Sequence, residues 1–286
     1  MKIKRLSLQD SFHKSLHVRR DTYPQHHQVW HYHDEVEFIY IIKGTGTLFV
    51  GDCIQTIVPG NCVLIGSNLP HYWMFDENYL IGDSRIDCIV IHFHPHFLGE
   101  NFFQIKELKI LNDCLLASGR ALFLADTDKR WHSLFHAILE EEHVLKITGL
   151  LNALYYFQKE NPHSLVSKNY AFLNHSLDEK RMNDVIQYIK QNYRHKVELQ
   201  ELAALARMTK NSFCRYFKQK TGKTPIQFVS ELRVSHACKL LKSSELNLKE
   251  ICFDSGFNSF VNSHKIFKSI TKTSPKQYQK RHNKHS

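Results

Sequence analysis

A cluster of histidines and one glutamate near the start of this 286-residue chain has the side chains needed to bind a ligand or a metal ion. Strand alternation would place His31, His33 and Glu37 on one face, which is the arrangement that a shared divalent cation needs. Neutral imidazoles also exchange hydrogen bonds with hydroxyl groups, so the same residues suit a pocket for a small polar molecule. The predicted effector-binding residues are His31, His33, Glu37, His71, Trp73 and His92.

Three interpretations of this cluster are open at the level of sequence. The first, which we favour, is a polar pocket without metal that binds a small polar effector, with sugars among the candidates. The second is a divalent metal ion held by His31, His33, Glu37 and His71. The third is metal-dependent catalysis. We therefore predict no required cofactor and no catalytic residue.

A second set of polar residues, in the last hundred or so residues, has the chemistry of base recognition in DNA. Phe213 and Phe217 lie four residues apart on a predicted helix capped by Thr209, so both turn inward and leave polar residues outside. Arginine can pair with guanine through two hydrogen bonds, asparagine with adenine, and lysine with guanine or phosphate. The predicted DNA contacts are Lys210, Asn211, Cys214, Arg215 and Lys218 on this helix, and Ser259, Phe260, Val261, Asn262, His264 and Lys265 on a second one.

These two helices belong to an internal repeat. Phe217-Lys218 recurs 50 residues later as Phe267-Lys268, whereas Glu201 recurs 49 residues later as Glu250, so the second copy has one extra residue in its turn. Each copy has the order helix, turn, helix, followed by a helix that a proline begins. We predict helix-turn-helix units at about 199–220 and about 248–270.

Charge divides the chain into two parts. The net charge is +10 at pH 7. From Lys180 to Ser286 there are 22 Lys and Arg against 7 Asp and Glu, a net charge of +15, while residues 1–179 have a net charge of −5. Such asymmetry is typical of a protein with one half that binds a polyanion. Double-stranded DNA is therefore the predicted partner.

Cysteine usage and hydropathy argue against a secreted or membrane protein. The seven cysteines never form a C-x-x-C pair, which favours reduced thiols over a disulfide framework. The sequence has no signal-peptide pattern at its start and no apolar run of about 18 residues. We expect a cytoplasmic, nucleoid-associated protein without a membrane partner.

The elements that would position these residues indicate a two-domain α+β protein. Short β-branched and aromatic runs between about 30 and 100, punctuated by Gly, Pro and Asn, predict a small barrel. Apolar residues at helical spacing in 129–146 and around 150–157 predict helices that cover the open side of the barrel or form a dimer seam. The predicted boundaries are 1–100 for an effector-sensing barrel, 101–160 for a helical segment, 161–180 for a linker and 181–286 for an all-α DNA-binding domain.

Motifs between Met182 and Arg281 match a known family. They are Phe213-x-x-Tyr216-Phe217-Lys218, Arg233-x-x-x-Ala237-x-x-Leu240-Leu241, Ile251-Cys252-Phe253-Asp254-Ser255-Gly256-Phe257, and Phe267-Lys268 followed by Ser274-Pro275. This segment resembles the AraC/XylS family of transcription regulators, which implies that both recognition helices enter successive major-groove segments on one face of DNA. The chain departs from the family at Ser263, where a large apolar residue is usual, and we expect Phe260 or Val261 to anchor the helix instead.

In the first half, His31-x-His33-x-x-x-Glu37 with Gly44 resembles the first metal motif of cupin barrels. The spacing to His71 is longer than the strict second motif, and the terminal asparagine of that motif is missing. In many AraC/XylS regulators such a cupin-like barrel binds a small effector. The resemblance implies an effector-responsive homodimer that activates a metabolic or transport operon and, as an activator, contacts RNA polymerase.

Two other functions fit the sequence less well. A cupin enzyme with a basic appendage would need an intact four-ligand metal site, and the second motif is incomplete. A nonspecific architectural DNA-binding protein would need neither a separate pocketed domain nor Arg and Asn directed at base edges. We therefore predict a sequence-specific transcription regulator and not an enzyme.

Overall fold

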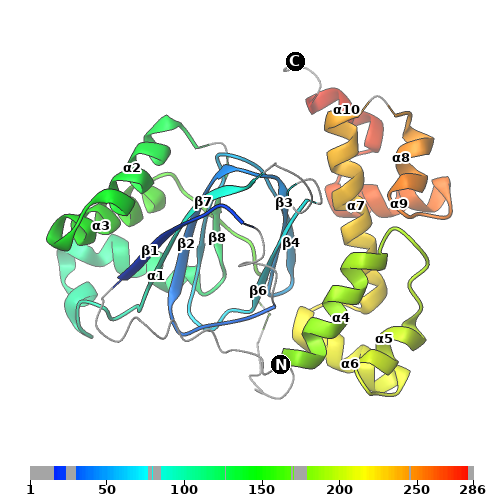
Figure 1. Cartoon of the computed structure of the whole chain (residues 1–286), viewed down its shortest axis with the longest axis horizontal. Coiled ribbons are helices and arrows are strands. Elements are labelled where there is room, and N and C mark those ends of the chain that lie inside the picture. The colour runs from blue at the N-terminus through cyan, green and yellow to red at the C-terminus, as the bar shows by residue number, and fades with distance from the viewer. Residues whose placement is uncertain are drawn as a thin grey trace. The chain divides into compact units, whose positions relative to one another are not determined.

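The computed structural model describes residues 16–23, 30–76, 79, 85–125, 127–168, 170, 179–244 and 246–282. The chain divides into two compact units, residues 1–172 and 173–286. The first unit contains all the strands and the second is helical, which is the two-domain α+β class that the sequence predicted (Figure 1). Within the described residues, no helix is long and apolar enough to cross a lipid bilayer.

The strands of the first unit form two antiparallel sheets. The larger sheet has the order β1-β7-β2-β5-β8-β9 and the smaller one has the order β4-β3-β6. The strands are β1 (Leu16–Asp21), β2 (Val36–Lys43), β3 (Gly46–Val50), β4 (Cys53–Ile57), β5 (Cys62–Ile65), β6 (His71–Phe75), β7 (Asp87–Phe93), β8 (Leu122–Leu124) and β9 (His163–Ser164).

Strand β2 is buried on both faces, which explains its almost unbroken apolar sequence. Ile39 and Ile41 point into the core that includes residues of both sheets. Phe38 and Tyr40, in the alternate positions, pack against the helices on the outer side. Glu37 lies two residues before Ile39 on the same strand, so its carboxylate points to the same side, into the barrel interior.

Three helices cover the outer face of the larger sheet (Figure 1). They are α1 (Lys109–Ser118), α2 (Lys129–Glu140) and α3 (His143–Lys159), preceded by the short 3-10 helices η3 (Phe102–Gln104) and η4 (Lys106–Leu108). Phe135 and Phe157 each contact the ring of Phe38, with centroids 4.9 and 5.1 Å apart. The sequence left two roles open for these helices; in the structure they pack on the outer face of the larger sheet, and a dimer seam stays a prediction.

The barrel extends further along the chain than predicted. Strand β8 comes from the segment 101–160 that was predicted to be helical, and β9 comes from the predicted linker 161–180. Both strands lengthen the larger sheet beyond β5. Strands of three and two residues are too short to show a periodic pattern, so only their hydrogen-bonded neighbours define them.

The second unit contains two helix-turn-helix pairs at the predicted places. Its helices are α4 (Glu179–Asn192), α5 (Leu199–Leu205), α6 (Lys210–Thr221), α7 (Pro225–Ser243), α8 (Leu248–Asp254), α9 (Phe260–Thr271) and α10 (Pro275–His282). The turn between α5 and α6 has four residues and the turn between α8 and α9 has five, as the repeat predicted. Thr209 caps α6 by accepting a hydrogen bond from the amide of Ser212.

Candidate DNA-binding surface and barrel site

Helix α6 separates an apolar inner face from a polar outer face. Phe213 and Phe217 are fully buried, as the spacing of the two residues predicted. Of the five predicted DNA contacts on this helix, the exposed residues are Lys210, Asn211, Arg215 and Lys218, and Cys214 is half-buried. The outer face therefore offers arginine, asparagine and lysine side chains to an approaching polyanion, which is the set that can hydrogen-bond base edges and phosphates.

Helix α9 presents fewer of its predicted contacts. Val261, Asn262 and Lys265 are exposed, and the Ser259 hydroxyl is used as a helix cap, where it accepts a hydrogen bond from the amide of Asn262. Phe260 and His264 do not fit the predicted outward orientation. Phe260 packs against the apolar core of this half, and its ring lies 4.5 Å from that of His264.

Ser263 leaves the second helix-turn-helix less tightly packed than the first. It occupies the position that Phe213 has in the first copy, and it is 5% exposed. Its hydroxyl only donates to the carbonyl of Phe260, one turn earlier on the same helix. Val261, one of the two residues predicted to serve as anchor, is 65% exposed and therefore is not one. Phe260, the other, is only partly buried.

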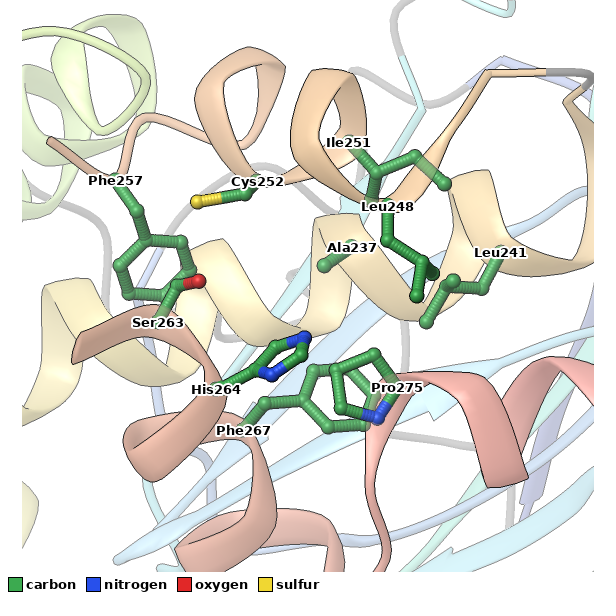
Figure 2. Close-up of a pocket in the computed structure, with 10 residues that line it drawn as sticks. All are labelled: Ala237, Leu241, Leu248, Ile251, Cys252, Phe257, Ser263, His264, Phe267 and Pro275. Carbon is green, nitrogen blue, oxygen red and sulfur yellow. The ribbon is translucent and has the colours of Figure 1, made fainter. Parts of the chain in front are cut away.

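A small cavity of about 20 Å³ remains beneath α9, between this helix, α7 and α8 (Figure 2). Figure 2 shows the side chains of Ser263 and His264 directed toward it. The Nε2 atom of His264 is buried without a hydrogen-bond partner. The walls are mainly apolar: Ala237, Leu241, Leu248, Ile251, Cys252, Phe257, Phe267 and Pro275. This volume is about that of one water molecule, so α9 lacks the packing that a phenyl ring gives α6.

Glu37 lies at the centre of the histidine cluster in the barrel. In the register of β2 and β7 it pairs with His92, whose Nε2 lies 2.9 Å from Glu37 Oε2. The indole of Trp73 donates to Glu37 Oε1 at 3.0 Å. Trp73 is fully buried, and its hydrogen bond orients the carboxylate.

The protonation of His92 follows from its neighbours. Arg19 lies 3.1 Å from His92 Nδ1 and can only donate, so Nδ1 is the acceptor, and Nε2–H donates a hydrogen bond to Glu37. Burial lowers the pKa of His92 to about 4, which keeps this imidazole neutral. Burial also favours a neutral Glu37, but the imidazoles of His71, His33 and His92 outweigh it and hold the pKa of Glu37 well below its usual range.

Two other imidazoles face the same carboxylate through their Nε2 atoms. His33 Nδ1 lies 2.9 Å from the carbonyl of Glu35, and His71 Nδ1 lies 2.9 Å from the carbonyl of Leu69. A carbonyl only accepts, so Nδ1 is the donor in both rings, and Nε2 is the atom that faces Glu37. These Nε2 atoms are buried without a hydrogen-bond partner, 3.6 and 3.7 Å from Glu37 Oε2.

The cluster is assembled from more than one strand. His31 forms an isolated bridge with His71, and β2 begins only at Val36, so His31, His33 and Glu37 do not share one strand as predicted. They converge nevertheless, because the segment before β2 bends back toward β6. One ligand atom from each of His31, His33, Glu37 and His71 lies within 4.8 Å of the others.

This donor set fits a transition-metal ion. Four ligand atoms arranged as a tetrahedron at about 2.0–2.1 Å from one zinc ion are about 3.4 Å apart, so the four side chains would need to move inward by up to about 1 Å to bind it. Three imidazole nitrogens and one carboxylate suit zinc and similar ions better than calcium or magnesium, which prefer oxygen ligands. The Nε2 atoms of His33 and His71, buried without a hydrogen-bond partner, are an independent reason for a ligand at this place.

Comparisons with known proteins agree with the two units. A cupin domain family matches residues 21–78, and a helix-turn-helix domain family matches residues 202–281. The helix-turn-helix-type transcriptional regulator YdeC of Bacillus subtilis (strain 168) is 25% identical over 87% of this chain and 85% of its own length. The transcriptional activator RhaS of Mannheimia succiniciproducens is 23% identical over 86% of this chain and 87% of its own. Among solved structures, ToxT from Vibrio cholerae has a TM-score of 0.36 and 17% identity, covering 92% of this chain and 97% of that one.

Proposed function

Because the chain belongs to the AraC/XylS family of DNA-binding transcription regulators, we propose that it binds its operator with α6 and α9 in two successive major-groove segments. The proposed contacts on α6 are Lys210, Asn211, Cys214, Arg215 and Lys218. On α9 they are Ser259, Val261, Asn262 and Lys265, with Phe260 and His264 supporting the helix from inside.

The observation that carries this proposal is the presence of two outward polar helix faces in one basic unit. Helix α7 joins the two pairs and has 19 residues, which correspond to about 28 Å. This length is close to the pitch of B-DNA, about 34 Å, so a single protein can address two turns of one DNA face. The basic charge of the same unit supports binding to the phosphate backbone between these segments.

The test is selection of bound sites from random DNA by the full-length protein. We expect a two-part site, in which Arg215→Ala relaxes the preference in one part and Asn262→Ala relaxes it in the other. Lys249→Ala, an exposed cation on α8, is the control that should leave both preferences unchanged. A site without sequence preference, or one in which both substitutions relax the same part, would contradict the proposal.

The ligand that we propose for the barrel is a transition-metal ion, held by His31, His33, Glu37 and His71. At the level of sequence we favoured a polar molecule such as a sugar, but donor atoms within 4.8 Å of one another enclose an ion and leave no room for a sugar ring between them. When bound, the ion would supply positive charge and tie β2, β6 and the 31–33 segment together. His92 and Trp73 would orient Glu37 from outside the metal.

Metal analysis of the purified protein tests this ligand. We expect about one zinc or similar ion per chain, lost in His33→Ala and in His71→Ala and retained in the control His94→Ala, an exposed histidine just after β7. The His33→Ala and Glu37→Ala double variant should lose the effect of metal on transcription but keep basal DNA affinity. Wild-type protein that takes up no metal in a zinc titration would refute the assignment.

The remaining features of the proposal concern assembly and output. We propose a homodimer formed through the solvent-facing side of α3, where large apolar side chains are exposed: Val144, Leu145, Tyr155 and Tyr156.

Similarity to RhaS, a transcriptional activator, supports an activator that contacts RNA polymerase at a metabolic or transport operon. The relatives are regulators, and we assign no catalysis. A DNA partner and free cysteines support a cytoplasmic location.

A further inference from the structure

The loop between α4 and α5 comprises residues 193–198, and its first three residues reach across the second unit to the other helix-turn-helix. Arg194 donates to the carboxylate of Asp254 at 2.7 Å and to the carbonyl of the same residue at 3.1 Å. Asp254 is the last residue of α8, which belongs to the second helix-turn-helix, whereas the loop leads directly into the first. The two DNA-binding pairs are thus connected by this contact as well as by α7.

His236, in the middle of α7, completes a chain of polar contacts with this loop. The hydroxyl of Tyr193 lies 3.2 Å from His236 Nδ1, and His236 Nε2 lies 3.2 Å from Asp254 Oδ2. Asp254 accepts at Oδ2, so Nε2–H donates to it and Nδ1 accepts from the tyrosine. A neutral imidazole satisfies both contacts, and burial lowers the pKa of His236 in the direction that keeps the ring neutral.

Backbone packing brings the loop against the second turn. Arg233 of α7 donates to the carbonyl of Tyr193 at 2.6 Å and to that of His195 at 2.7 Å. Gly256 has a φ of +87°, and a Cβ atom at this position would lie 2.7 Å from the Cα of Arg194. The loop therefore approaches the α8–α9 turn as closely as backbone atoms allow, and only glycine permits this contact.

We propose that Arg194, His236 and Asp254 are positioning residues that lock the two helix-turn-helix pairs at one separation and angle. The proposal rests on the function proposed above, in which both α6 and α9 contact DNA. A single helix such as α7 bends and twists with modest cost, so a second connection beside it is what makes the pair rigid. A rigid protein accepts only operators whose two parts have one spacing, because an extra base pair rotates the second part by about 34–36° around the DNA axis.

The test compares operators of different spacing with full-length protein. The wild-type protein should lose at least about tenfold in affinity when one base pair is inserted between the two parts of its selected site. In Arg194→Ala the loss of affinity on insertion should fall to about threefold or less. The affinity of this variant for the site with native spacing should be modestly lower than that of the wild type. Lys196→Ala is the matched control, because this substitution removes the same charge from the same loop, and Lys196 pairs with the exposed Glu198 within that loop. It should keep the wild-type penalty.

A second, more conservative variant tests the same contact in case Arg194→Ala disturbs folding. Asp254→Asn keeps the shape of the side chain while it removes the charge that Arg194 and His236 share, and it should lower the spacing penalty in the same way. If one inserted base pair lowers the affinity of the wild type, Arg194→Ala and Asp254→Asn equally, and both variants keep the wild-type helix content, the positioning role is wrong. The two-helix mode of DNA binding would be unaffected by that result. A selected site with only one conserved part would overturn both this role and the two-helix mode of DNA binding.

Discussion

Alanine substitutions at the two equivalent positions, Phe213 and Ser263, should have very different effects on stability. Phe213 is fully buried against Phe217, and removal of a buried phenyl ring costs about 3–5 kcal/mol. Ser263→Ala loses only a hydrogen bond within α9, which contributes about 0.5–1.5 kcal/mol, and it relieves the burial of a hydroxyl. We therefore expect a difference of at least about 2 kcal/mol between the two variants.

Urea unfolding of the full-length protein can measure this difference unit by unit. The three tryptophans, Trp30, Trp73 and Trp131, all lie in the first unit, so their fluorescence reports on the barrel. Helix content measured by circular dichroism includes the second unit. Phe213→Ala should lower the midpoint of the circular-dichroism transition and leave the fluorescence transition in place. Equal destabilisation by the two alanine variants would show that Ser263 packs as tightly as Phe213 and would refute the reasoning from the cavity.

Three further outcomes follow from particular contacts. Arg215→Ala should lose about 1–3 kcal/mol of binding free energy at the selected site, measured by fluorescence anisotropy, with thermal stability almost unchanged; an equal loss on random DNA would make Arg215 a phosphate contact. Burial lowers the pKa of His236, so the unfolded chain takes up that proton first and stability falls as the pH drops below about 6.5. His236→Asn should reduce the loss of unfolding free energy between about pH 7.5 and 5.5, and an unchanged loss would show that the ring does not titrate this way. Val144→Glu with Leu145→Glu should convert a dimer to a monomer in sedimentation measurements, and a persisting dimer would place the seam elsewhere.

The DNA-binding half could be predicted almost entirely from sequence, because its signals are local. Caps such as Thr209, prolines at helix starts and apolar residues three and four apart act within a single helix or turn. Comparison with the pattern of the family that the sequence resembles also identified Ser263 as the exception. What replaces the missing anchor was not predictable, because the packing of Phe260 and the exposure of Val261 depend on how α9 lies against α7 and α8.

In the barrel, residue types alone identified the cluster around Glu37 but not its chemistry. Both a sugar pocket and a metal site were compatible with the sequence. The orientation of the Nε2 atoms depends on the carbonyls of Glu35 and Leu69, and the protonation of His92 depends on Arg19, which comes from a strand more than 70 residues away. Arg19 carried no sequence signal, because an arginine on a short strand has no distinctive spacing.

The sequence by itself determined the class of protein, its two-part organisation and which side of α6 is polar and exposed, since amphipathic spacing, caps and charge act over a few residues. Only the tertiary structure decided which side chains share an environment. Arg194 and Asp254 are 60 residues apart, and both are common surface residue types, yet folding places them 2.7 Å apart. Hydrogen bonds and lone pairs act over a few ångströms, so their consequences arise only once distant segments of the chain are packed together.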